Sequence, residues 1–354
     1  MADKLIVGVV YGSDTAQLPE DGHDFGGVNV QFLGHNDAPR LIDSNQCVVV
    51  PVLLTPEYLA RNWRYDFNRF DVIFNAMSDP DVGQSSLLMA ISVLAGTKTP
   101  IVNDPRHVIR TRRDIISGSL RSFSGLLVPK TVRLMPGQTA SVVAAEQAMQ
   151  FPILLRSAGS HSDHETGLIK VETAAELDAA LAAGAVTVPA YMSEFVESRN
   201  SQGLYLKMRL VICGSTVLLR HYIHSDHWLI KAASQTFMHE RPELLEIERK
   251  AAADPLAVLP PRGPELLAAI KGRVGLDYFG IDCTPLPDGR LLIFEVNAVM
   301  NMLPASRHPG RGPLMVAAID RVASDFNGLL RQRAGLLPGK KDASLATTAP
   351  KEKR

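Results

Sequence analysis

The sequence has few cysteines, no excess of either charge and no long apolar run, and each absence excludes a class of protein. The three cysteines, Cys47, Cys213 and Cys283, lie far apart in apolar surroundings. This spacing excludes a disulfide scaffold and a cysteine metal cluster, and predicts buried thiols in a reducing compartment. Because 37 basic and 37 acidic residues give a net charge of +0, we expect neither nucleic acid nor an anionic membrane as partner. No apolar run approaches the ~20 residues that a membrane helix needs.

Phosphate-binding and metal-binding motifs of the familiar local kinds are also missing. There is neither a Walker-type phosphate loop nor a glycine-rich dinucleotide fingerprint. His221, His224 and His227 recur every three residues, but on a strand this spacing alternates between the two faces. A zinc site is therefore not favoured.

The start of the chain predicts a strand, and its last residues predict a disordered tail. The start lacks the basic stretch, long apolar core and cleavage site of a secretory signal, so we expect a first strand over residues 5–10 and a cytoplasmic protein. Residues 336–354 are rich in Lys, Ala, Thr and Pro, which predicts a disordered tail.

The composition predicts more than one packed unit. A chain of 354 residues with 46% hydrophobic side chains can form several cores. In the first part, short β-rich runs alternate with a segment suited to a helix at residues 85–95. We therefore expect residues 1–105 to form a small parallel α/β domain.

The rest of the chain predicts two α+β lobes. A helix over residues 106–117 and a strand over residues 128–134 begin a small lobe that we place at residues 106–190. Residues 191–335 predict a second, β-rich lobe that ends in a helix. The chain shows no internal repeat, so we expect neither a solenoid nor a propeller.

A hairpin near residue 288 is the sharpest chemical feature of the sequence. Asp288-Gly289 is a turn dipeptide between two apolar strands. Because side chains alternate along a strand, Glu295 and Asn297 share a face, and hairpin pairing brings Asp282 beside them. The sequence thus predicts three oxygen donors in one small volume.

Two carboxylates and an amide this close together favour a bound cation. They would repel one another unless an ion lay between them, and Mg²⁺, or Mn²⁺, prefers such oxygen ligands. The alternative is that Asp282 and Glu295 are solvated residues of an ordinary amphipathic hairpin. Ile293, Phe294 and Val296 argue against it, because they make the strand around Glu295 apolar.

This hairpin resembles the magnesium hairpin of the ATP-grasp superfamily, in which an Asp and a Glu-x-Asn hold the metals; Asp282, Glu295 and Asn297 match it. The resemblance covers about residues 100 to 330. It implies an ATP-grasp fold in which two α+β lobes grip ATP, preceded by a small parallel α/β domain. It also implies ATP and Mg²⁺ as cofactors.

Two further stretches resemble the nucleotide-binding parts of that superfamily. Arg156 ends a strand where relatives have a phosphate-binding Lys, and a loop that covers the phosphates follows it. Arg keeps the positive charge and grips two phosphate oxygens, although an exposed arginine at a strand end stays an alternative. Glu194, Phe195 and Val196 resemble the hinge that reads adenine and ribose, and a plain edge strand is the alternative there.

Lys207 and Arg209 lie on one face of a predicted strand, where two cations repel each other unless an anion lies over them. A Lys-x-Arg pattern followed by a His-Trp pair, here at residues 227–228, is similar to the ATP-grasp branch associated with tetratricopeptide repeats. This chain has no such repeats. We expect Arg209 to stabilise charge during phosphoryl transfer and Lys207 to hold the nucleotide.

The resemblance implies an ATP-dependent ligase that joins a carboxylate to an amine, or a thiol, through an acylphosphate and releases ADP and phosphate. Its partners would be small-molecule or peptide substrates bound between the N-terminal sheet and the metal site, and a homodimer is possible. Two alternatives stay open: a small-molecule kinase with the same ATP site, and a non-catalytic nucleotide-binding regulator, suggested by Arg156 and the acidic loop after it.

Overall fold

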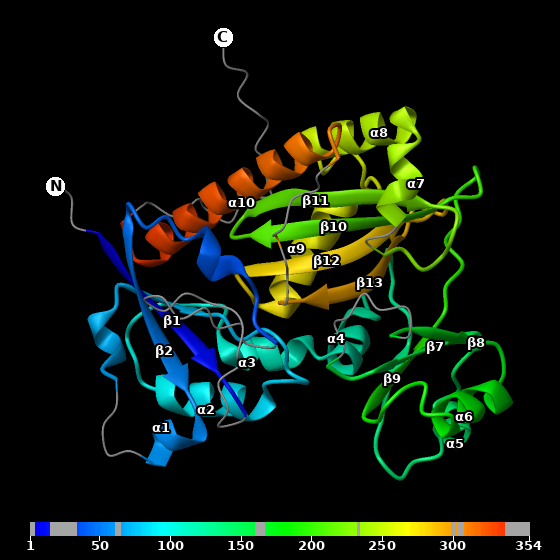
Figure 1. The fold of residues 1–354 in the computed structure, drawn as a ribbon, viewed down its shortest axis with the longest axis horizontal. Helices are drawn as coiled ribbons and strands as arrows, with labels where there is room; N and C mark the ends of the chain where they lie inside the picture. Colours follow the sequence, from blue (N-terminus) through cyan, green and yellow to red (C-terminus); the bar gives the residue numbers. More distant parts are fainter. Residues whose placement is uncertain are drawn as a thin grey trace.

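The computed structural model describes residues 4–14, 34–60, 65–159, 167–231, 234–298, 302 and 308–336. Residues 160–166 of the predicted phosphate loop and residues 337–354 of the predicted tail lie outside this part. Within it, the strands form three sheets, one in each region of the chain (Figure 1). None of the described helices is both long and apolar enough to span a bilayer.

The N-terminal sheet is parallel, with the order β2-β1-β3-β4. Its strands are β1 (Leu5–Gly12), β2 (Cys47–Leu54), β3 (Val72–Asn75) and β4 (Ile101–Val102). The helices of this region are α1 (Pro56–Ala60) and α2 (Gln84–Leu94), with short 3-10 turns at Ala38–Leu41 and Phe67–Arg69. A parallel sheet needs cover on both faces, and Val7, Val9 and Val10 are fully buried. The predicted parallel α/β unit is confirmed.

The helix predicted over residues 106–117 is broken in the structure. It consists of α3 (Pro105–Val108), a 3-10 turn (Ile109–Thr111) and α4 (Arg113–Leu120). Arg112 between them has extended backbone angles, φ −52° and ψ 133°, and its guanidinium binds Asp114 in the first turn of α4 at 2.8 Å. An acid in the first turn favours a helix start, so α4 begins anew at Arg113.

The small sheet is antiparallel, with the order β6-β9-β7-β8. Its strands are β6 (Thr131–Leu134), β7 (Ile153–Ser157), β8 (Ile169–Val171) and β9 (Ala190–Glu194). Helices α5 (Ala140–Glu146) and α6 (Ala174–Ala182) pack on it through a core of their own that includes Leu134, Ile153 and Leu177.

The large sheet has the order β11-β10-β12-β13-β5. Its strands are β10 (Tyr205–Cys213), β11 (Thr216–Ser225), β12 (Tyr278–Pro285), β13 (Leu291–Asn297) and the short parallel β5 (Leu126–Leu127). The helices around it are α7 (Gln235–His239), α8 (Pro242–Ala253), α9 (Gly263–Val274) and α10 (Gly312–Arg333). Helices α9 and α10 cover opposite faces (Figure 1). Strand β5 comes from the region predicted as the small lobe, residues 106–190, but pairs with the large sheet. The predicted domain boundaries at residues 105, 190 and 335 therefore stay a prediction.

A buried asparagine ties the N-terminal region to the large sheet. Asn103 follows β4 in the left-handed conformation, with φ 58°, and is completely buried. Its side chain donates to the Tyr278 carbonyl at 2.7 Å and accepts from the Tyr278 amide at 2.9 Å. Since buried polar groups of this kind are costly to leave unpaired, the contact fixes β4 against the start of β12.

Cys47, Cys213 and Cys283 are buried free thiols, as predicted.

Candidate active site

A cavity of about 620 Å³ lies between the large and the small sheet. This volume is in the range of small-molecule and cofactor sites. All nine residues that the sequence singled out line the cavity: Arg156, Glu194, Phe195, Val196, Lys207, Arg209, Asp282, Glu295 and Asn297. They come from β7, from β9 and the residues after it, and from β10, β12 and β13.

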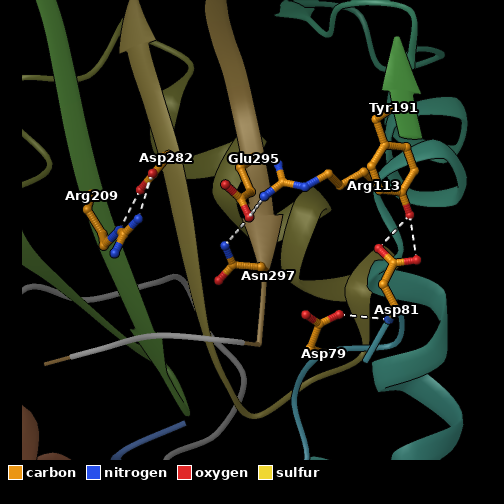
Figure 2. Close-up of polar contacts among 8 residues, drawn as sticks. All are labelled: Asp79, Asp81, Arg113, Tyr191, Arg209, Asp282, Glu295 and Asn297. Atoms are coloured by element: carbon orange, nitrogen blue, oxygen red, sulfur yellow. Dashed lines mark hydrogen bonds and ion pairs between the residues drawn. The ribbon is translucent and has the colours of Figure 1, made fainter. Parts of the chain in front are cut away.

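The hairpin β12–β13 brings its three oxygen-bearing side chains together. Asp282 and Glu295 are direct register partners, and the Asn297 amide donates to Glu295 Oε1 at 2.5 Å (Figure 2). The register shifts between Asp282 and Cys283, which leaves Phe294 as the extra residue of a β-bulge. Bulges of this kind re-aim neighbouring side chains and are frequent beside active sites.

Asp282 forms a two-point ion pair with Arg209 on the adjacent strand. The guanidinium donates to the two carboxylate oxygens at 2.6 and 2.7 Å, and the two residues are register partners (Figure 2). Burial alone would raise the pKa of Asp282, but the charge and hydrogen bonds of Arg209 outweigh it and lower the pKa below its ordinary value. Two cations on one strand face were expected to need an anion over them, and for Arg209 this anion is the Asp282 carboxylate.

Glu295 pairs with an arginine that the sequence analysis missed. Arg113, at the first position of α4, donates to Glu295 Oε1 at 2.5 Å (Figure 2). Burial would raise the pKa of Glu295, but Arg113 and then Arg156 lower it to about 2. The only sequence signal for this contact is the basic run Arg110 to Arg113, which does not indicate where the side chains point.

The donor set of the hairpin fits a magnesium or manganese ion. Both carboxylates have lowered pKa values and are therefore ionised at neutral pH, and Asn297 adds an amide oxygen. In the described part of the chain no group of three or more His, Cys, Asp or Glu side chains is arranged around a metal site. Phosphate and water would have to complete the coordination, as Mg²⁺ prefers. Arg113 and Arg209 would share these carboxylates with the ion.

The small sheet contributes Arg156 to the opposite wall. Burial, followed by the charge of Arg113, lowers the pKa of Arg156 to about 10, so it stays cationic at neutral pH. Its register partner on β9 is Tyr191, whose hydroxyl donates to the Asp81 carboxylate at 2.6 Å (Figure 2). Arg133 also reaches Asp81 at 3.1 Å. The sequence analysis missed this junction, because it joins residues that are 110 positions apart.

The residues predicted to form the hinge lie at and after the end of β9. The amides of Glu194 and Phe195 donate to the carbonyls of Lys130 and Pro152, at 2.9 and 2.8 Å. These two amides are therefore used in the sheet, and a nucleotide would meet other groups of the hinge. The ring of Phe195 packs edge-on against Trp228, with centroids 5.7 Å apart, and both line the cavity.

Lys207 faces the cavity from β10, on the same side as Arg209. Its ammonium donates to the carbonyl of Ile230 at 3.0 Å, which holds the segment after β11 near the hinge. Both side chains are partly exposed at the cavity, whereas Met208 between them is completely buried in the core, so the predicted sharing of one strand face by Lys207 and Arg209 is confirmed.

Comparisons with known proteins identify the fold. No family model matches the sequence, and no curated protein resembles it in sequence. The VanG D-Ala:D-Ser ligase from Enterococcus faecalis superposes with a TM-score of 0.54 at 15% identity, covering 93% of this chain and 100% of that chain. The D-alanine-D-alanine ligase from Coxiella burnetii gives a TM-score of 0.53 at 10% identity, covering 94% and 96%.

A D-alanine–D-alanine ligase from Bacillus anthracis, complexed with ATP, gives a TM-score of 0.50 at 15% identity and covers 94% of this chain and 99% of that chain. At these identities the likeness concerns the fold. The chain has an ATP-grasp fold with a preceding parallel α/β unit.

Proposed function

We propose that this protein is an ATP-dependent ligase, which binds MgATP between its small and large sheets and joins a carboxylate to an amine or a thiol. The observation that carries the proposal is the convergence of Asp282, Glu295 and Asn297 with Arg156, Lys207 and Arg209 on one cavity. The shared fold with D-Ala–D-Ala and D-Ala:D-Ser ligases, one of them complexed with ATP, supports it.

In this proposal the nucleotide lies along the cavity from the hinge to the metal hairpin. Phe195 and Trp228 provide an aromatic surface for the adenine. Lys207 and Arg156 provide positive charge for the phosphates, and Arg156 can hold two phosphate oxygens with its planar fork. Asp282, Glu295 and Asn297 hold the ion, which neutralises charge on the transferring phosphoryl group.

Arg209 is placed to act on the reacting centre itself. Its pairing with Asp282 fixes the guanidinium at the cavity wall before substrate arrives, so little reorganisation is needed when negative charge develops. Phosphoryl transfer to the substrate carboxylate gives an acylphosphate. Attack by the amine then releases phosphate and forms the amide, while the amine loses its proton.

The test is phosphate release by the purified protein with MgATP, a panel of carboxylic acids and a panel of amines. A ligase releases phosphate only when both substrates are present, whereas a kinase forms ADP with the acceptor alone. Binding of MgATP without any turnover would favour the regulatory alternative. One observation motivates that alternative: both carboxylates of the hairpin already carry arginine partners. Failure to bind adenine nucleotide with magnesium would exclude the ligase, the kinase and the nucleotide-binding regulator alike.

A further inference from the structure

Two histidines that are far apart in the chain stack on each other beside the large sheet. His239 is the last residue of α7, and His308 begins the turn that leads into α10. Their rings are nearly parallel, with an interplanar angle of 11° and centroids 3.9 Å apart. Helices α7 and α8 lie side by side at the end of the large sheet where α10 begins (Figure 1). The stack therefore fastens the end of α7 to the start of α10.

Both rings are placed as neutral imidazoles. The Gly310 amide donates to His308 Nδ1 at 3.2 Å, which is possible only while Nδ1 carries no proton. His239 Nε2 is buried and has no hydrogen-bond partner among the described residues. Protonation would cost the first ring a hydrogen bond and would leave the second with a buried donor that has no acceptor.

Arg311 and Glu248 are the charged groups that face the stack from the start of α10 and from α8. Arg311 is completely buried, and its guanidinium donates to the two carboxylate oxygens of Glu248 at 2.7 and 2.8 Å. Glu248 also accepts from the Tyr222 amide at 3.1 Å. Because Glu248 is already bound by a cation at two points, little of its charge is left to compensate a proton on either ring.

The other titratable groups near the stack add no free negative charge. From β11, His224 lies against Met238, with its amide donating to Met238 Sδ at 3.3 Å, and burial lowers the pKa of His224. Glu240 and Arg241 follow α7 directly and pair with each other at 4.0 Å. The surroundings of the two rings thus favour the neutral form.

The pKa of His239 agrees with this geometry. Burial, and then the charges of His308 and Arg311, lower it below 6.5 and outweigh the opposite effect of Glu248. Because the folded protein then binds the proton less readily than the unfolded chain, the contact is fully stable above pH 6.5. It loses stability as the pH falls below that value.

Helix α7 also supports one wall of the proposed nucleotide cavity. Gln235, its first residue, lines the cavity. Met238 is completely buried in a small core with Tyr205, Ile223 and Ile230, all three of which line the cavity as well. A change in the position of α7 therefore reaches the cavity through this core.

We infer that the His239–His308 stack is a proton-sensitive clamp, which holds α7 on the start of α10 at neutral pH and releases it in acid. Two protonated rings with centroids 3.9 Å apart repel each other, and Arg311 adds to the repulsion. Release of α7 loosens the wall of the cavity, so acid weakens binding there. This last effect rests on the proposed nucleotide site, whereas the clamp itself does not.

Amide hydrogen exchange of the protein without ligand tests the clamp, at pH about 7.5 and about 5.5. After correction for the intrinsic pH dependence of exchange, the protection of α7 and of residues 308–312 is expected to fall by at least about tenfold in acid. Helix α9, on the opposite face of the sheet from α10, is the internal reference and should keep its protection. Equal protection of α7 at both pH values would overturn the inference.

Variants assign the acid effect to the stack. His239→Phe keeps an aromatic ring against His308 but has no group that takes up a proton, so its α7 should keep its protection at both pH values. His107→Gln is the control, since His107 belongs to α3 and contacts the Gly275 carbonyl, and it should retain the acid effect. A loss of protection in acid that persists in a folded His239→Phe variant would overturn the inference.

Adenosine binding, measured by calorimetry, tests the link to the cavity, because adenosine has no group that titrates between these pH values. The wild type is expected to bind it about threefold or more weakly in acid, and His239→Phe equally well at both pH values. Equal affinity of the wild type at both pH values would refute the effect on the cavity. Absence of adenosine binding at neutral pH would contradict the proposed nucleotide site, while the exchange measurement would still decide on the clamp.

Discussion

The two arginine–carboxylate pairs of the cavity are nearly equal in length but differ in what holds them. Arg209 and Asp282 lie 2.6 Å apart on adjacent strands of one sheet, where they are register partners. Arg113 and Glu295 lie 2.5 Å apart, but Arg113 comes from α4, which packs on the sheet from outside it (Figure 2). Backbone pairing therefore fixes the first pair, and packing of a helix fixes the second.

This difference suggests a division of roles within the cavity. The pair within the sheet gives a rigid charge arrangement, suited to a transition state that tolerates little displacement. The pair between α4 and β13 depends instead on the packing of α4, whose Ile116 and Leu120 lie in the same core as Ile293 of β13. Tyr191–Asp81 is a second contact of that kind, at the junction of the small sheet with the N-terminal region.

Loss of charge at Glu295 should give the largest effect. Glu295→Gln keeps the size of the side chain but removes a proposed metal ligand, so we expect turnover to fall more than about 100-fold. Phosphate release measures turnover, and circular dichroism checks the fold. Glu246→Gln is the control, because Glu246 pairs with Arg249 on the exposed surface of α8. Turnover within about tenfold of the wild type would exclude Glu295 as a ligand.

Arg209→Ala should lower kcat by about 100-fold or more, with a smaller loss of MgATP affinity, because its charge acts where negative charge develops. Removal of Arg209 also leaves Asp282 buried without this partner, a change that destabilises a fold by roughly 3–5 kcal/mol when the pair is fully desolvated. Arg209→Lys separates the two effects, since it keeps a cation. If nucleotide affinity fell as much as kcat, the role in the transition state would be wrong.

Tyr191→Phe tests the hydrogen bond between the small sheet and the N-terminal region. The hydroxyl donates to a carboxylate, and such a hydrogen bond contributes about 1.5–3 kcal/mol. We expect faster amide hydrogen exchange in β7 and weaker MgATP binding, with adenosine binding unchanged because Arg156 meets only the phosphates. Tyr58→Phe is the control, since its hydroxyl accepts from the Tyr65 amide in the N-terminal region. An equal loss of affinity for ATP and for adenosine would contradict the predicted effect on the phosphates alone.

Acid should weaken the pair between α4 and β13 in a defined pH window. The pKa of Glu295 is about 2 in the folded protein, below its ordinary value of 4.5. A lowered pKa in the folded state gives stability that is complete above pH 4.5 and is lost as the pH falls toward 2. The difference in unfolding free energy between wild type and Glu295→Gln, measured in urea, should therefore shrink across this window. A difference that does not change with pH would show that the ion pair contributes no stability.

Much of the site followed from local rules of the chain. The Asp288-Gly289 turn and the two-residue period of strands place Asp282, Glu295 and Asn297 together, and the same period puts Lys207 and Arg209 on one face. Arg156 was predicted from the resemblance of its strand to the phosphate-binding strand of ATP-grasp proteins. The amides of Glu194 and Phe195 show the limit of such rules, because their partners on neighbouring segments could not be derived from the local pattern.

The sequence by itself determined which side chains face the cavity from the hairpin and from β10, because side-chain alternation and turn chemistry act between near neighbours. Only the tertiary structure decided the contacts between distant segments: Arg113 with Glu295, and Tyr191 with Asp81. These contacts depend on how a broken helix and a distant loop pack against the two sheets. Packing of that kind joins residues far apart in the chain, and no local periodicity encodes it.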